Sequence, residues 1–154
     1  MKVNYDFLIV GGGIVGLTLA RELAHRKLGT IAVLEKESGV GFHASGRNSG
    51  VVHAGIYYPA DSLKANFCVN GARLLLQYVD AQRLPVLKCG KVIVATRPET
   101  VATLSTLLAR ASQSGVEAKR ISIDDLRELE PHAKTHEWAI WSPNTAIIDS
   151  KAVL

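Results

Sequence analysis

The chain has 154 residues, of which 47% are hydrophobic and 21% are charged. This length is enough for one domain with a sizeable core, and this balance excludes disordered and fibrous classes of protein. The net charge of +4 suits an anionic small ligand, but no run of basic residues indicates nucleic acid, so we expect no nucleic-acid partner.

The first 36 residues show the pattern of a βαβ unit. Residues 5–10 are a short apolar run that predicts a buried strand, and it ends in three glycines. Apolar residues at helical spacing predict a helix over residues 14–26, and a second buried strand is expected over residues 30–34. Continuous apolar runs of this kind are typical of parallel sheets, so we expect the two strands to be parallel.

A long loop rich in glycine and serine follows over residues 38–50, and a loop of this length calls for a functional reason. Residues 51–58 predict a strand that places Val51, His53, Gly55 and Tyr57 on one face. The remaining expected elements are a helix over 61–81, a strand over 91–95, a helix from Pro98 to Gly115, a strand over 116–121, a short helix between Ser122 and Pro131, a strand over 137–141, an extended segment over 144–148 and a helix start at Asp149 and Ser150.

Several expectations concern what the chain lacks. Cys68 and Cys89 form no C-x-x-C pair and have no zinc spacing, so we expect reduced thiols and no metal site. No stretch reaches the roughly 18 apolar residues of a membrane helix. The N-terminal apolar run is too short for a signal peptide. We therefore expect a cytoplasmic protein, with peripheral membrane contact left open.

The sequence Gly11-Gly12-Gly13-Ile14-Val15-Gly16 lies between the first strand and its helix. Gly11 permits the tight turn, Gly13 lets a pyrophosphate approach the backbone, and Gly16 lets the helix pack close to the strand. The N–H groups that begin the helix, including those of Ile14 and Val15, attract phosphate. Glu35 ends the second strand, roughly 20 residues further on, where an acid binds a ribose diol. The pattern predicts a dinucleotide site.

The choice of dinucleotide is less certain from these residues. An acid at Glu35 argues against NADP, whose 2′-phosphate it would repel, but NAD and FAD both use this unit. Lys36 has two interpretations: it lies over the adenine or contacts phosphate, or it is a solvated surface lysine.

The stretch His43–Tyr58, HASGRNSGVVHAGIYY, resembles the flavoprotein family of L-2-hydroxyglutarate oxidases and dehydrogenases, within the D-amino-acid-oxidase-like group. The likeness runs along the whole chain through LIVGGGIVGLTLARELAHR, VLEKE, SLKANFCVNGARLL, CGKVIVAT and SPNTAIIDS. The resemblance implies an α/β fold, with a Rossmann-like FAD-binding βαβ unit followed by the start of an α+β substrate domain. The implied divisions are residues 1–84 in the FAD-binding domain, 85–148 in the substrate domain, and 149–154 as the start of a helix that returns to the FAD-binding domain.

The resemblance also implies the cofactor and the chemistry. FAD is the expected cofactor, with its ADP half held by the glycines and Glu35. The loop formed by Gly46, Arg47, Asn48 and Ser49 would pass under the pyrophosphate and ribityl chain. His53 would accept the hydroxyl proton of a 2-hydroxy acid while hydride passes to the flavin, although a structural histidine is an equally open interpretation. Oxygen or a quinone would then take the electrons.

The chain also departs from the family that it resembles. Family members are more than twice this length, and the later segments would complete the sheet and the flavin site. Strands near Leu8 and Val33 are therefore expected to expose apolar surface, and we expect no activity from this fragment. Two alternatives stay open: a related FAD-dependent amino-acid or glycerol-3-phosphate oxidase or dehydrogenase, and a non-catalytic remnant of a disrupted flavoprotein gene.

Overall fold

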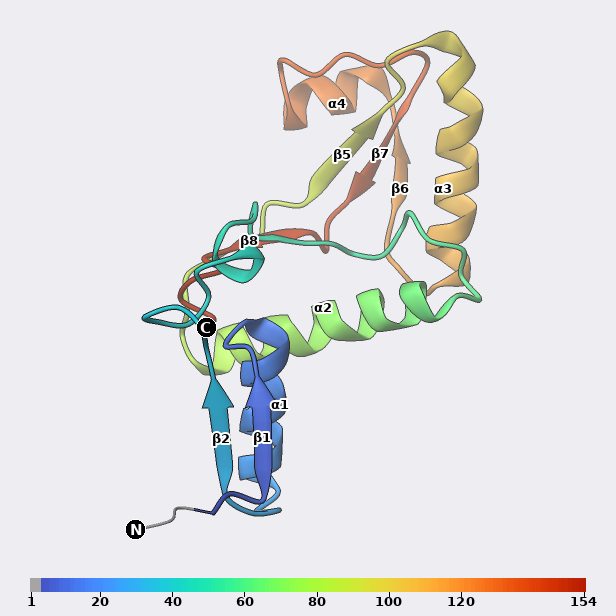
Figure 1. Ribbon diagram of the computed structural model, residues 1–154. Helices are drawn as coiled ribbons and strands as arrows, with labels where there is room; N and C mark the ends of the chain where they lie inside the picture. The colour runs from blue at the N-terminus through green and yellow to red at the C-terminus, as the bar shows by residue number, and fades with distance from the viewer. Residues whose placement is uncertain (1–3) are drawn as a thin grey trace. The chain divides into compact units, whose positions relative to one another are not determined.

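The computed structural model describes residues 4–154, and the chain forms two compact units. Unit 1 comprises residues 1–50 and 149–154, and unit 2 comprises residues 51–148. In the structure, residues 51–84 belong to unit 2, together with the segments up to residue 148. The division expected at residue 84 is a functional one: it separates the segment that binds the cofactor from the segment that binds the substrate. This functional division stays a prediction. Figure 1 shows the elements of both units.

Unit 1 contains the βαβ arrangement that the sequence predicts. Strand β1 (Phe7–Val10) leads into helix α1 (Ile14–His25), and strand β2 (Ile31–Leu34) follows. The two strands are parallel, in register from Phe7 opposite Ile31 to Val10 opposite Leu34, which confirms the expected pairing. Ile9 is buried and faces α1. Its Cγ2 atom lies 3.2 Å from the position that a β-carbon on Gly16 of α1 would occupy. In the loop after β2, a short 3₁₀ turn covers Ala44–Gly46.

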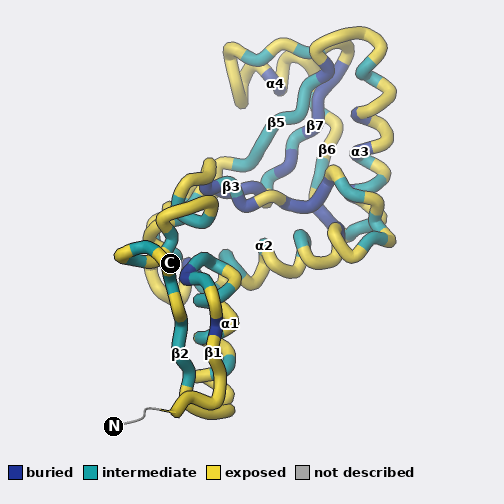
Figure 2. The backbone as a smooth tube through the Cα atoms, in the orientation of Figure 1, coloured by how far each residue is buried: buried dark blue, intermediate teal, exposed yellow. Residues whose placement is uncertain are grey.

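The opposite face of the β1–β2 pair is uncovered. Side chains alternate along a strand, so Leu8 and Val10 point away from the face that Ile9 shares with α1. Their exposed fractions are 60% and 83%, and that of Leu34, paired with Val10, is 54%. In Figure 2 the tube of β1 is yellow apart from one dark blue stretch, and that of β2 is mostly teal. This exposure confirms the apolar surface that was expected near Leu8.

Unit 2 is built from two small antiparallel sheets and three α-helices. In one sheet the strand order is β3 (Val51–Val52), β8 (Ala146–Ile148), β4 (Val86–Leu87), and in the other it is β5 (Lys91–Val94), β7 (Ala139–Ser142), β6 (Lys119–Ile121). The helices are α2 (Leu63–Ala81), α3 (Val101–Gln113), which follows the 3₁₀ turn Pro98–Thr100, and α4 (Ile123–Leu129).

Local signals explain where these helices begin and end. The Ser62 hydroxyl accepts a hydrogen bond from the Ala65 N–H at 3.1 Å and begins α2. Before α4, the Ser122 hydroxyl accepts from the Asp125 N–H at 3.1 Å, and the Asp125 carboxylate accepts from the Ser122 N–H at 2.9 Å. This reciprocal pair is the expected capping box. Gly115 follows α3 at a φ of +66°, where an L side chain is strained.

The core of unit 2 forms where α3 packs on the β5–β7–β6 sheet. Leu104, Leu107 and Ala111 share one side of the helix and are all buried. On the sheet, Ile140 is fully buried at the centre of β7, the darkest strand of this sheet in Figure 2. A helix stripe at this spacing gains most of its stability from such packing.

Two elements differ from the expectations. The strand over 51–58 ends at Val52, because Gly55 has a φ of +95°, and the next residues turn although Ile56 remains buried. Strand β4 was not expected. The turn at Asp149 agrees with the expected helix start, because the Asp149 carboxylate accepts from the Lys151 and Ala152 N–H groups at 2.9 and 3.2 Å, as an N-cap does. Its continuation as a helix stays a prediction. Within residues 4–154, no helix combines the length and apolar character needed to cross a bilayer.

The packing of unit 2 predicts a large difference between two isoleucines. Ile140 is 0% exposed in β7, whereas Ile147 in β8 is 41% exposed. Ile140→Ala should lower the free energy of unfolding by about 2–5 kcal/mol, since it leaves a cavity in the core. Ile147→Ala should lower it by less than about 1 kcal/mol. Urea denaturation of both variants measures this, and equal losses would contradict the assignment of the core.

Candidate functional site

The glycine turn between β1 and α1 has the backbone geometry that the motif requires. Gly11 has a φ of +109°, in the region that favours glycine, and its N–H donates to the Leu34 carbonyl at 2.7 Å. A β-carbon at Gly16 would overlap the Gly11 carbonyl oxygen. Glycine at both positions therefore lets α1 begin directly at the end of β1, with its first N–H groups at the turn.

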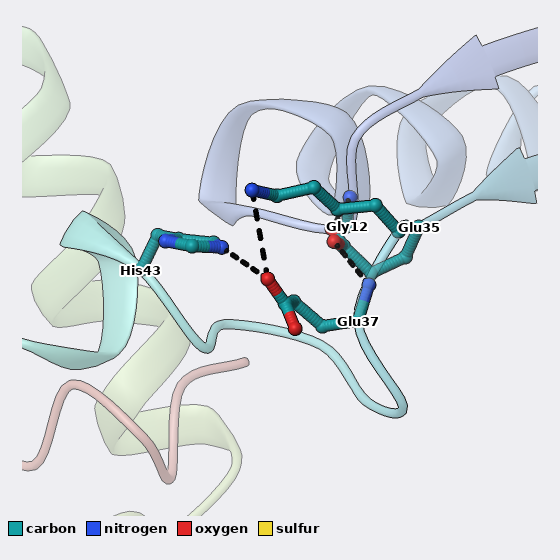
Figure 3. A network of polar contacts seen from close by, with 5 residues as sticks. Gly12, Glu35, Glu37 and His43 are labelled. Carbon is teal, nitrogen blue, oxygen red and sulfur yellow. Dashed lines mark hydrogen bonds and ion pairs between the residues drawn. The ribbon is translucent and has the colours of Figure 1, made fainter.

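Glu35 lies beside this turn and is bound to it. One carboxylate oxygen accepts from the Gly12 N–H at 2.6 Å, and the other accepts from the Glu37 N–H at 3.1 Å. Figure 3 shows the Gly12 contact. Hydrogen bonds from Glu37 and then Gly12 hold the pKa of this carboxyl below its ordinary value. Each oxygen keeps acceptor capacity for a ribose hydroxyl, because a carboxylate has about four lone-pair sites.

The loop after β2 contributes a residue that the sequence analysis missed. The Ser45 hydroxyl accepts from the Ile14 N–H at 3.0 Å and lies 3.0 Å from where a β-carbon on Gly13 would be. No hydrogen bond of the described residues satisfies the Val15 or Gly16 N–H. Ser45 therefore occupies one of the donors at the start of α1 and leaves others for an anion. Only the glycine- and serine-rich composition of the loop hinted at such a contact.

The other predicted loop residues have different surroundings. The Asn48 side chain donates to the Ala44 and Ser45 carbonyls at 3.0 and 2.8 Å and accepts from the Gly50 N–H at 2.8 Å, so it shapes the loop itself. Gly46 and Arg47 line a cavity of unit 1 with a volume of about 380 Å³. Ser49 is exposed. Their roles at a cofactor stay predictions.

Lys36 and His43 both meet Glu37. Lys36 Nζ lies 3.5 Å from a Glu37 carboxylate oxygen, and His43 Nε2 lies 2.8 Å from the same atom. Figure 3 shows this small polar network beside the Gly12–Glu35 contact. The charge of Lys36 thus has a partner in the protein, which supports the interpretation of a surface lysine more than that of a phosphate ligand.

His53 belongs to unit 2 and directly follows β3. Its side chain is exposed, and its backbone carbonyl accepts from the Cys68 thiol at 3.5 Å. Burial raises the pKa of that thiol. The expected strand face of Val51, His53 and Gly55 does not exist beyond Val52, but the imidazole remains accessible to a ligand.

The close approach at Gly16 predicts opposite effects for two helical glycines. Gly16→Ala should lower the free energy of unfolding by about 1–3 kcal/mol, because the new methyl group overlaps the turn. It should also weaken FAD binding, measured by quenching of flavin fluorescence. At Gly71 in α2 a β-carbon meets nothing within 4 Å, so Gly71→Ala should stabilise the chain by roughly 0.5–1 kcal/mol. A neutral Gly16→Ala would show that the approach is not tight.

The hydrogen bonds to Glu35 predict a dependence of stability on pH. Since the folded-state pKa is lowered, their stabilisation is complete above the ordinary carboxyl pKa and is lost as pH falls through the folded-state value. The variant Glu35→Gln should therefore have a lower Tm than the unchanged chain at neutral pH. This difference should shrink towards zero in strong acid. A Tm difference that is the same at both pH values would contradict the role of the charge.

Curated relatives match nearly the whole chain. It is 49% identical to the mitochondrial L-2-hydroxyglutarate dehydrogenase of Nematostella vectensis, over 95% of this chain and 32% of that protein. For the human mitochondrial enzyme, identity is 44% over 97% of this chain and 33% of that protein. The chain thus spans about a third of the length of these relatives. These relatives are mitochondrial proteins. The expectation of a cytoplasmic location is therefore wrong.

Solved structures give the same picture of the fold. An FAD-bound L-α-glycerophosphate oxidase from Mycoplasma pneumoniae has a TM-score of 0.86 and 26% identity, covering 99% of this chain and 42% of that chain. Glycine oxidase from Geobacillus kaustophilus has a TM-score of 0.85 and 22% identity, covering 97% and 42%.

A family model gives the last comparison. The glycine turn, the acid that ends β2 and the pairing of β1 with β2 are features of a dinucleotide-binding unit. The family model DAO, whose description is FAD dependent oxidoreductase, matches residues 6–154 of this chain. The chain therefore belongs to the DAO family of FAD-dependent oxidoreductases.

Proposed function

We propose that this chain forms the cofactor-binding part of an FAD-dependent enzyme that oxidises L-2-hydroxyglutarate, or a similar 2-hydroxy acid, to the 2-oxo acid. The observation that carries this proposal is the likeness to L-2-hydroxyglutarate dehydrogenases, at 44–49% identity for the two relatives named above. The glycine turn and Glu35 independently support the FAD part of this proposal, because they supply the contacts that the ADP half of the cofactor needs.

In this proposal each element of unit 1 holds a different part of FAD. The free N–H groups that begin α1 and the Ser45 hydroxyl bind the phosphates. The Glu35 carboxylate accepts hydrogen bonds from the ribose hydroxyls. Gly46 lets the loop pack on the Gly41 carbonyl, where a β-carbon would overlap, and Arg47 supplies a cation to the rest of the cofactor. When bound, FAD supplies the hydride acceptor of the reaction.

His53 is the proposed proton acceptor. Oxidation of a 2-hydroxy acid removes a hydride from C2 and a proton from the hydroxyl oxygen, and it leaves a C2 carbonyl. An exposed imidazole is well suited to take that proton, because a ring nitrogen can accept a hydrogen bond from the substrate hydroxyl. No hydrogen bond of the described residues uses the His53 side chain, so both ring nitrogens are available.

The complete reaction requires more than this chain in our proposal. Because residues 1–154 span about a third of the relatives, we expect no turnover from these residues alone. Oxygen or a membrane quinone would receive the electrons after the substrate has left.

A second candidate is oxidation of glycerol phosphate. It is favoured by the FAD-bound L-α-glycerophosphate oxidase, which shares 26% identity with this chain. The higher identity to L-2-hydroxyglutarate dehydrogenases, 49% in one case, makes the 2-hydroxy acid the first choice. The two candidates differ in the acid group of the substrate, so direct comparison of both substrates separates them.

The experiment uses a polypeptide that joins this chain to the rest of the family fold and carries FAD. Anaerobic addition of L-2-hydroxyglutarate should bleach the flavin absorption bands, whereas glycerol 3-phosphate should leave them unchanged. His53→Asn should slow bleaching by about 10²–10⁴-fold, because the proton acceptor is lost. The affinity for FAD should stay the same.

His132→Asn is the matched control, since His132 is another exposed histidine of unit 2 that lies in the turn after α4. Its variant should bleach at the normal rate. Bleaching by glycerol 3-phosphate alone would reject the first candidate in favour of the second. A normal rate for His53→Asn would remove His53 from the reaction without affecting the proposed substrate.

A further inference from the structure

Unit 2 contains a cavity of about 440 Å³ that is lined by residues of this unit alone. One wall is the side of α2 that carries Val69 and Arg73, and another is the turn from β7 to β8 that carries Thr145. The volume falls in the range of about 300–1,000 Å³ that is usual for small-molecule sites. None of the residues assigned above to the cofactor or to proton transfer lines it.

The charge of this lining is positive. Arg73 and Lys88 are its charged residues, and it contains no carboxylate. Lys88 Nζ has a partner, the Asp80 carboxylate at 3.0 Å. Arg73 makes no ion pair or hydrogen bond with the residues that the structure describes. An uncompensated guanidinium at the rim of a cavity attracts an anion, and its forked donors match a carboxylate.

A buried hydroxyl in the same lining also lacks a partner. Thr145 is 3% exposed, and its Oγ1 has no hydrogen bond within the described chain. Ser142, at the end of β7, and Ser114, next to the lining residue Gly115, carry further buried hydroxyls without partners. Buried polar groups in folded proteins are nearly always paired with protein, water or ligand. The Thr145 hydroxyl is therefore an unpaired polar atom within the wall of the cavity, closed to solvent.

The remaining walls are largely apolar. Val69, Leu76, Val116 and Ala146 line the cavity, and they offer hydrocarbon surface to a ligand. A fully hydrated inorganic anion gains nothing from such walls, whereas a carboxylate with a hydrocarbon body buries apolar area against them at about 25 cal/mol per Å².

We propose that this cavity binds a small organic carboxylate with an apolar body. The carboxylate lies against the Arg73 guanidinium, and the hydrocarbon part contacts Val69, Leu76 and Val116. The proposal does not rest on the proposed function, because it uses none of the cofactor or proton-transfer residues.

The test is an NMR titration of the ¹⁵N-labelled 154-residue chain, after circular dichroism has established that it is folded. Three probes separate the two parts of the ligand: hexanoate has charge and apolar body, hexan-1-ol has only the apolar body, and inorganic phosphate has only the charge. Hexanoate should give saturable shifts in residues 69–76 and 143–146. The other two probes should bind at least about tenfold more weakly, which is the effect of losing one charge-assisted contact.

Variants of the chain test these contacts. Arg73→Met should weaken hexanoate binding about tenfold and leave hexan-1-ol binding unchanged. Its matched control is Arg127→Met, because Arg127 lies on α4, pairs with Asp124 and does not line the cavity. Thr145→Val should raise the Tm of the free chain, because an unpaired buried hydroxyl is removed, and should leave hexanoate binding unchanged. Ser142→Ala should raise the Tm without weakening binding.

Several outcomes would overturn the proposal. Equal binding of hexanoate and hexan-1-ol would show an apolar pocket with no role for charge. Binding of phosphate as tight as that of hexanoate would show a simple anion site. Unchanged hexanoate binding by Arg73→Met, or the absence of shifts in residues 69–76 and 143–146, would remove the assigned position. Loss of turnover in the complete enzyme would bear on the proposed function alone.

Discussion

The hydrogen bond between the Glu35 carboxylate and the Gly12 N–H is the contact on which the cofactor site depends. It joins the end of β2 to the turn after β1, at the point where the Gly11 N–H also binds the Leu34 carbonyl. The two strand ends and the start of α1 are thereby fixed together. An anion at the free N–H groups and a diol at the carboxylate can then be held by one rigid element, which lowers the entropy lost on binding.

The sequence was most informative where structure is local. The βαβ unit follows from apolar spacing and from glycines whose roles are set by their immediate neighbours, and it was predicted nearly to the residue. The capping box at Ser122 and Asp125 lies within four residues and was also predictable. In the candidate site, the glycines and Glu35 were found in this way, because the motif itself fixes the spacing between strand, turn and acid.

Predictions were wrong or incomplete where periodicity and motif spacing do not show which backbone conformation or which contact forms. Ser45 reaches the Ile14 N–H across 31 positions, and no local pattern indicates which loop hydroxyl does so. The strand after Val51 ends early because Gly55 has a positive φ, whereas the alternation of side chains alone favoured continuation. The amide of Asn48 binds backbone groups of its own loop, which the motif does not indicate, and its role at the cofactor stays a prediction. Competition for a side chain by nearby backbone groups is seen only in three dimensions.

The two candidate sites illustrate different ways to attract an anion. In unit 1, backbone N–H groups at the start of α1 act without a cation, so their attraction depends on the direction of the helix and on close approach at Gly13. In unit 2, the Arg73 guanidinium acts through its full charge, and apolar residues such as Leu76 select what accompanies the anion. The first arrangement favours a compact phosphate, whose oxygens can each meet an N–H. The second favours a carboxylate on a hydrocarbon body. The carboxylate meets the forked donors of the guanidinium, and the hydrocarbon part meets the apolar wall.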